Sequence, residues 1–67
     1  MPWDSQNYPD SLKNFTPEVR DKAIEIANAL LEEGHDESSA LAIATDRAKD
    51  WAERRGIAVR KDEVGRS

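Results

Sequence analysis

Apolar side chains recur every three or four positions in two segments of this chain, which predicts two amphipathic helices at about 17–33 and 37–55. On a wheel of about 100° per residue, the apolar arc of the first helix is about 160° wide, enough to contact more than one neighbouring element. That arc holds Val19, Ala23, Ile24, Ile26, Ala27, Leu30 and Leu31. The second helix gathers Ala40, Leu41, Ile43, Ala44, Ala48, Trp51 and Ala52 on one face.

The second apolar face is rich in alanine, whose small side chain lets two helix axes approach closely. Trp51 is expected to fill one end of the packed pair, so that Trp51→Ala would cost several kcal/mol. Because only a few residues connect the helices, we expect them to run antiparallel.

Capping residues mark the ends of both helices. Thr16 is the expected N-cap of the first helix and Pro17 its first residue. Gly34 can adopt the left-handed conformation that ends a helix. Asp36 is the expected N-cap of the second helix, which Gly56 should end.

The first fifteen residues show no such period but contain large apolar side chains, namely Trp3, Tyr8, Leu12 and Phe15. A turn at Pro9 precedes a short helical turn, for which Asp10 or Ser11 is the expected cap. The predicted fold class is therefore all-α: an antiparallel two-helix hairpin with an N-terminal aromatic segment and a short helical turn packed on it.

Length limits the chain to one domain, which we predict at 1–59. Residues 57–59 are apolar and should pack against the hairpin, whereas 60–67 are predicted to form a disordered basic tail. A core this small is near the minimum that folds unaided. Self-association into a homodimer is therefore one reading of the wide apolar arc.

Charge is divided unevenly along the chain, whose formal net charge is −4. Residues 1–53 carry 5 Lys and Arg against 12 Asp and Glu, whereas 54–67 carry 5 against 2. The acidic body repels phosphate, so only the basic end offers a nucleic-acid footprint. The absence of cysteine, of a membrane-spanning apolar run and of a secretory signal predicts a cytoplasmic location without membrane attachment.

The residues present predict no catalytic, cofactor or metal site. His35 lacks a cysteine partner, Ser38 lacks an evident base, and no Gly-rich phosphate loop is present. The charged connection at 32–37 lacks the ligand pattern of calcium loops and the further nitrogen or sulfur ligands of zinc sites. We therefore expect a solvated loop there and a protein that is not an enzyme.

A non-enzymatic protein-interaction or regulatory module is the leading prediction. Spacings of three and four align an acidic ridge on the first helix, made of Glu18, Asp21, Glu25, Asn28 and Glu32. The ridge could dock a basic partner, although an ordinary solvated face also explains it. Trp3, so close to the terminus, would be a binding hot spot if exposed. The candidate partner-binding residues are Trp3, Glu18, Asp21, Glu25 and Glu32.

The alternative is a nucleic-acid-associated protein that uses the basic C-terminal end. Its candidate residues are Arg54, Arg55, Arg60 and Lys61. Arg54 and Arg55 also suit the negative end of a helix dipole, and acids at 62–63 interrupt the basic run.

Several stretches resemble small uncharacterised bacterial proteins of the YdaT type. These stretches are Met-Pro-Trp at 1–3, YPDSLKN at 8–14, KAIEIANAL at 22–30 before Glu33-Gly34, and AIAT at 42–45 ahead of Trp51. The likeness covers about residues 1–53, and a more distant one is to the ChaB family, whose members are labelled cation-transport regulators. The resemblance implies a bacterial, cytoplasmic, helical accessory protein associated with stress, and it carries over no functional residues.

Overall fold

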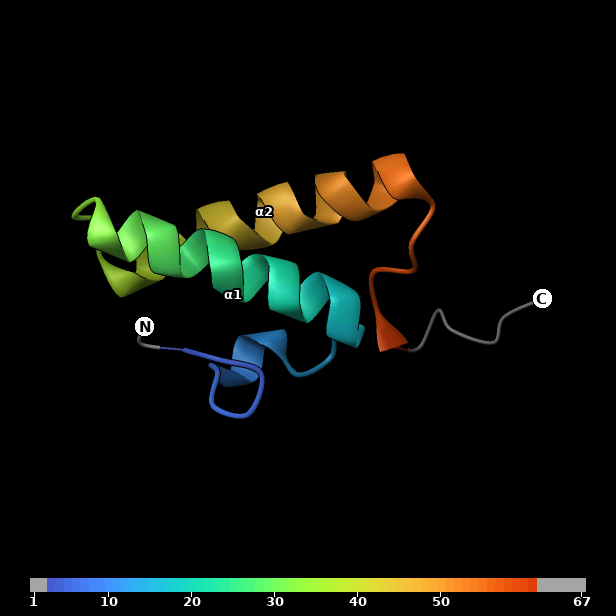
Figure 1. Ribbon diagram of the computed structural model, residues 1–67, viewed down its shortest axis with the longest axis horizontal. Helices are drawn as coiled ribbons and strands as arrows, with labels where there is room; N and C mark the ends of the chain where they lie inside the picture. The colour runs from blue at the N-terminus through green and yellow to red at the C-terminus, as the bar shows by residue number, and fades with distance from the viewer. Residues whose placement is uncertain (1–2, 62–67) are drawn as a thin grey trace.

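The computed structural model describes residues 3–61, which contain three helical elements. They are the short 3-10 helix η1 (Asp10–Leu12) and the long helices α1 (Pro17–Glu32) and α2 (Glu37–Arg55). Helices α1 and α2 pack against each other in antiparallel directions (Figure 1). Over residues 3–61 the only strand-like features are isolated bridges. The predicted all-α hairpin is confirmed, and the predicted helix bounds are correct to within one residue.

The connection between α1 and α2 is built from local signals. Gly34 has a φ of 104°, and the backbone N–H groups of Gly34 and His35 each donate to a carbonyl in the last turn of α1 at 3.1 Å. These two bonds satisfy carbonyl groups that a helix end leaves unpaired. Asp36 then caps α2, because its carboxylate accepts a hydrogen bond from the N–H of Ser39 at 2.7 Å. The predicted roles of Gly34 and Asp36 are confirmed.

The start of α1 lies where the sequence predicted it, but the Thr16 side chain has an unexpected partner. Thr16 has the extended backbone of an N-cap and Pro17 takes the first helical position, but no side-chain capping bond forms. Instead, the Thr16 hydroxyl donates to the carbonyl of Ala58 at 2.7 Å, and the Thr16 N–H donates to the carbonyl of Val59 at 3.0 Å. The predicted N-cap position of Thr16 is therefore confirmed, although its hydroxyl bonds to a distant carbonyl and not to the first turn of the helix.

Residues after α2 return to the start of α1. Gly56, with a φ of 69°, ends α2, and Val59 then reaches the core. Arg60 forms a bridge with Phe15, and the N–H of Lys61 donates to a carbonyl at position 14 at 2.8 Å. The folded part therefore extends at least to Lys61, past the predicted end at 59. Residues 62–67, the rest of the predicted tail, lie outside the described residues.

The core is small, and its large side chains come from several parts of the chain. Within α2 the buried side chains are all alanines, at 40, 44, 48 and 52. Leu12 and Val19 are the largest side chains that are fully buried, and Phe15 is 6% exposed. Trp51 lies only half-buried at the edge of this cluster, so the core is centred on η1, the start of α1 and Val59. The expectation that Trp51 fills the end of the helix pair is thus corrected.

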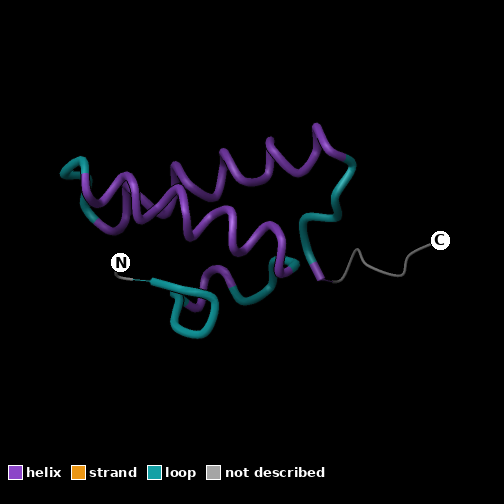
Figure 2. The backbone as a smooth tube through the Cα atoms, in the orientation of Figure 1, coloured by secondary structure: helices purple, strands orange, loops and turns teal. Residues whose placement is uncertain are grey.

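Residues 3–12 form an N-terminal arm that runs beside the hairpin (Figure 2). The arm places Leu12 in the core and packs its aromatic rings against the same cluster, which confirms the predicted folding back. No side chain caps η1, and Pro9 precedes it. The predicted cap by Asp10 or Ser11 is therefore wrong, because the turn closes through backbone bonds alone.

Candidate functional site

Trp3, predicted to be a hot spot if exposed, is held on α1 by its own backbone. Its N–H donates to the side-chain oxygen of Asn28 at 3.3 Å, and its carbonyl accepts from the side-chain nitrogen of Asn28 at 2.9 Å. Asn28 is only 3% exposed, and the indole of Trp3 is half-buried against the core. Trp3 is therefore an anchor of the arm, and its role as a partner-binding hot spot stays a prediction.

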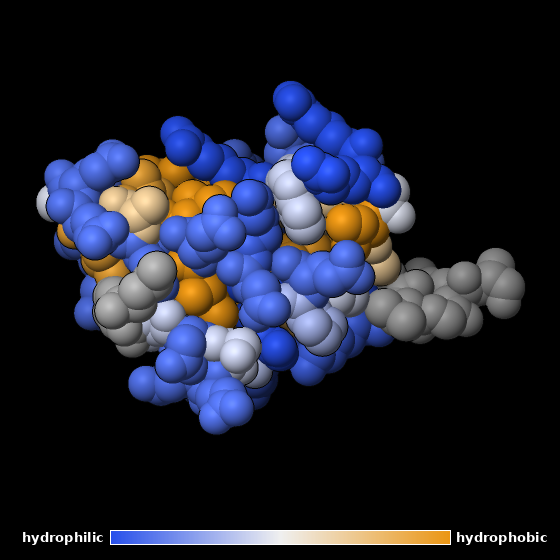
Figure 3. Space-filling model, in the orientation of Figure 1, coloured by the Kyte–Doolittle hydropathy of each residue, from blue (hydrophilic) through white to orange (hydrophobic). Residues whose placement is uncertain are grey.

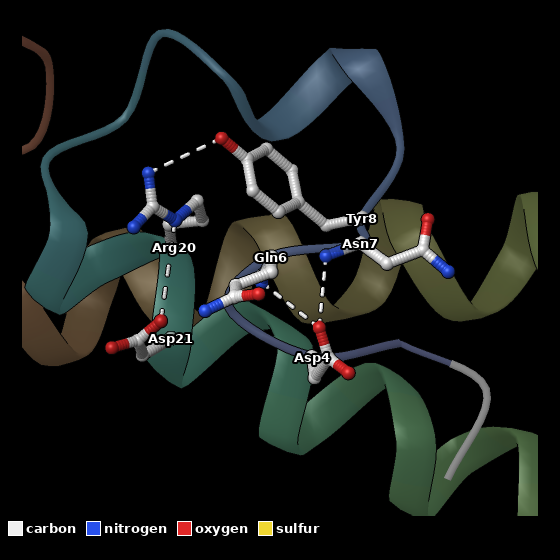
Figure 4. A network of polar contacts seen from close by, with 6 residues as sticks. All are labelled: Asp4, Gln6, Asn7, Tyr8, Arg20 and Asp21. Atoms are coloured by element: carbon white, nitrogen blue, oxygen red, sulfur yellow. Dashed lines mark hydrogen bonds and ion pairs between the residues drawn. The ribbon is translucent and has the colours of Figure 1, made fainter.

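A second anchor joins the arm to α1 through Tyr8 and Arg20 (Figure 4). The Arg20 guanidinium lies 4.8 Å from the centroid of the Tyr8 ring, and its Nη1 donates to the phenol oxygen at 3.3 Å. Both anchors attach to one side of α1, which we call the covered flank and define by Arg20, Ile24 and Asn28. All three side chains are at least partly buried there.

The acidic residues predicted to bind a partner do lie along the exposed side of α1: Glu18, Asp21, Glu25 and Glu32. The row is interrupted at Asn28, which is buried and engaged by the arm. Two members have cationic neighbours, since the Arg20 Nε lies 4.0 Å from Asp21 and the Lys22 ammonium lies 3.3 Å from Glu25. The predicted ridge is therefore divided, with one group at 18–25 and Glu32 near the turn.

The four basic residues of the nucleic-acid reading do not form one cluster. Arg54 pairs with Asp50 at 3.1 Å on α2, and Arg55 lies over the Trp51 ring at the end of the same helix. Arg60 and Lys61 lie beside the start of α1, where the Arg60 guanidinium is 5.8 Å from the Phe15 ring. The structure thus divides the set between two places at the open end of the hairpin. The open end is the end opposite the α1–α2 turn.

Trp51 carries the densest group of cationic contacts on the hairpin. The Lys22 ammonium from α1 lies 5.4 Å from the centroid of its ring, and the Arg55 guanidinium lies 5.3 Å away. A surface hollow beside the ring is lined by Arg47, Asp50, Trp51, Arg54 and Arg55. Cations over an indole are attracted by its π face, so the partly buried ring keeps positive charge at this surface.

Helical spacing extends this group along the line where α1 meets α2. On α1 and the residue after it, spacings of four and seven join Lys22, Ile26 and Glu33. On α2, spacings of four, four and three join Ile43, Arg47, Trp51 and Arg54. We call these two rows the uncovered seam. The α1 row lies about 180° around the helix from the covered flank. Ile26 and Ile43 are half-buried, and apolar surface follows the line between the helices toward the turn (Figure 3).

Charge changes sign along the uncovered seam. The open end has Lys22, Arg47, Arg54 and Arg55 together with Asp50, which pairs with Arg54, whereas residues 32–37 at the turn include four acids and no Lys or Arg. Hydrogen bonds from the Ser39 backbone and side chain, together with the nearby His35, hold the pKa of Asp36 below its ordinary value of 3.8. Glu33 is exposed and keeps helical backbone angles one residue past α1. The apolar pair Ile26 and Ile43 separates the cationic end from the acidic one.

The sequence reading missed this surface because it assigned Trp51 and Ile43 to the buried face. The buried alanines of α2 are spaced by four, and Trp51 falls one position short of that series. Its row with Ile43 and Arg47 was visible in the spacing. Helical spacing alone does not show which side of the hairpin the N-terminal arm leaves uncovered.

The described residues were also considered for metal binding and for membrane insertion. Within residues 3–61 no three His, Asp or Glu side chains gather in a group that could hold a metal ion. Neither long helix in that range has the length and apolar character needed to cross a membrane.

The fold and surface thus define a small all-α hairpin protein with one covered and one uncovered side. The chain is similar to the uncharacterised protein YdaT of Bacillus subtilis, with 57% identity over 53 residues. The match covers 79% of this chain but 35% of the relative, so the chain spans about a third of the length of the curated relative that it matches. This similarity supports the predicted likeness to YdaT-type proteins.

No protein-family model and no solved structure matches the chain. The more distant likeness to the ChaB family therefore stays a prediction.

Proposed function

We propose that the chain is a non-enzymatic protein-interaction module that docks an acidic protein surface on its uncovered seam. The observation that carries the proposal is the partly buried Trp51, which has two cations within 5.4 Å of its ring and lines a hollow with three arginines and Asp50. Tryptophan and arginine are the residue types most enriched among interface hot spots.

The environment of Trp51 supports a binding role over a purely structural one. A ring at the edge of the core already has one face packed, so it loses little conformational entropy when a partner covers the rest. Cations held against the ring are positioned before binding, and stacking leaves their N–H donors available to carboxylates. The partner expected at this surface presents carboxylates beside an apolar residue.

The proposal extends to the location of the protein and to the absence of catalysis. The module would act in the cytoplasm as a regulatory accessory and not by catalysis. Its lone His35 is exposed in the connection between the helices.

Crosslinking capture from bacterial lysate tests the proposal, with three baits compared under nuclease treatment. The baits are the wild type, Arg47→Glu in the uncovered seam, and Glu53→Arg as a control on the outside of α2. Both substituted side chains are exposed, so both variants should fold. We expect a protein partner that the wild type and the control capture and that Arg47→Glu loses.

Two results would contradict the proposal. Equal capture by all three baits would remove the uncovered seam from the interaction. Loss of every partner on nuclease treatment would favour the nucleic-acid alternative, in which neutralising Arg54, Arg55, Arg60 and Lys61 should abolish binding and added salt should weaken it steeply.

A further inference from the structure

We infer that a partner of the uncovered seam is a second copy of this chain, bound antiparallel so that two hairpins form a four-helix bundle. The inference rests on the proposed function, because it uses the same surface and names its occupant.

The first argument is charge complementarity within the seam itself. Its open end carries Lys22, Arg47, Arg54 and Arg55, and its turn end carries Glu33 beside Asp36. A two-fold axis makes an interface self-complementary, because a patch at one end of the first copy meets the patch at the other end of the second copy, and the reverse contact forms as well. With the axis lying across the middle of the seam, the cationic end of each copy faces the acidic end of the other.

The second argument is the apolar centre that such an axis brings together. Ile26 and Ile43 lie between the charged ends and are half-buried in the single chain. In an antiparallel pair these isoleucines meet their counterparts, and Trp51 of each copy covers the turn end of the other. Charged ends that flank an apolar centre form a polar rim around an apolar core, which is the usual anatomy of a protein interface.

The third argument is the distribution of large side chains in the isolated hairpin. The side chains that α2 buries are alanines, and the largest fully buried side chains of the described chain are Leu12 and Val19. Meanwhile Ile26, Ile43 and Trp51 stay half-buried. Chains of this size commonly gain stability by oligomerisation, because one hairpin buries too little apolar surface. A second copy would bury these three residues without a change of fold.

Alternative pairings fit the charges less well. A parallel arrangement would set Arg47 against the second copy's cationic end and Glu33 against its acidic end, and like charges placed opposite each other cost binding energy. Pairing through the covered flank would require the arm to leave both of its anchors on α1. The antiparallel pairing of the seams therefore brings opposite charges together and keeps the contacts between the arm and α1.

Sedimentation equilibrium of the full chain, with a charge-reversal cycle, tests the inference. The wild type should show a reversible monomer–dimer equilibrium. Arg47→Glu and Glu33→Arg should each raise the dissociation constant by about tenfold or more, because each sets like charges against each other. The double variant should return it to within about threefold of the wild type, since the opposite charges meet again. Glu53→Arg, outside the seam, serves as the matched control.

Rescue by the double variant is the outcome that only this pairing predicts. A wild type that stays monomeric at the highest soluble concentration would overturn the inference, as would a dimer that neither single reversal weakens. Circular dichroism of each variant identifies any loss of fold, and both single substitutions lie at exposed positions. If the wild type is monomeric while Arg47→Glu still loses a captured protein, the proposed function stands and the inference alone fails.

Discussion

The two sides of α1 differ in what they contact. The covered flank buries an amide and a guanidinium, and each is matched to one residue of the arm, Asn28 to Trp3 and Arg20 to Tyr8. The uncovered seam has comparable apolar and cationic side chains, but its cations meet an aromatic ring at the surface. The arm therefore belongs to the fold, and the seam is the surface that we propose for a partner.

The largest effect is expected from Leu12→Ala on the covered side. Leu12 has no exposed surface, so its loss leaves a cavity between η1 and the hairpin. Core leucine truncations typically cost about 3 kcal/mol, which is a large share of the stability of so small a domain. Urea unfolding followed by circular dichroism measures the loss. Ser11→Ala, exposed in the same turn, is the control, and a similar small effect of both changes would mean that the arm is not part of the core.

A smaller loss, about 1.5 kcal/mol, is expected from Asn28→Ala, which removes both hydrogen bonds to Trp3. Ala29→Ser, at the next exposed position of α1, should be close to neutral. Urea unfolding followed by circular dichroism measures the stability of both variants. Equal stabilities of the two variants would show that the anchor contributes nothing and would weaken the contrast between the two sides.

Thr16→Val should cost about 1 kcal/mol, because the carbonyl of Ala58 then loses the hydroxyl that donates to it at 2.7 Å. Thr16→Ser keeps that donor and should retain most of the stability. If serine and valine destabilise equally, the hydroxyl does not hold the C-terminal segment against α1. The comparison is made by the melting temperature at neutral pH.

The smallest effect is expected at Asp36, whose contacts are local and exposed. The Ser39 N–H keeps the pKa of this carboxyl below 3.8. Because the pKa is lower in the folded state, the carboxylate stabilises the fold at pH values above its unfolded pKa. This stabilisation is lost as the pH falls through the folded pKa. Asp36→Ala should therefore lower the melting temperature at pH 7, and the difference should vanish in stronger acid. A difference that persists unchanged in acid would show that the carboxylate charge is irrelevant to the cap.

Sequence patterns predicted the parts of this fold that depend on neighbouring residues. The helix bounds, the glycine and Asp36 caps and the alanine face all follow from spacings within a few positions. The errors share a different origin. The Thr16 hydroxyl has a partner more than forty positions away, and Trp3 has one twenty-five positions away. Local preference cannot choose between a cap and such a distant carbonyl.

The candidate site was predicted less well than the fold. The acidic ridge was correctly placed on one exposed side of α1, but its interruption at Asn28 depends on where the arm lies. Trp51 was assigned to the interior because helical spacing places it on the same face as the alanines. In the structure the alanines at 40, 44, 48 and 52 are buried, and Trp51, one position before the last of them, lies at the edge of their row.

The unfolding free energy of Trp51→Ala, measured in dilute protein beside Leu12→Ala, tests the central claim most directly. If the uncovered seam serves binding, losing this partly buried ring should cost the single chain about 2 kcal/mol, below the loss at Leu12. A loss as large as that of Leu12→Ala would contradict the account, because Trp51 would then belong to the core of the fold.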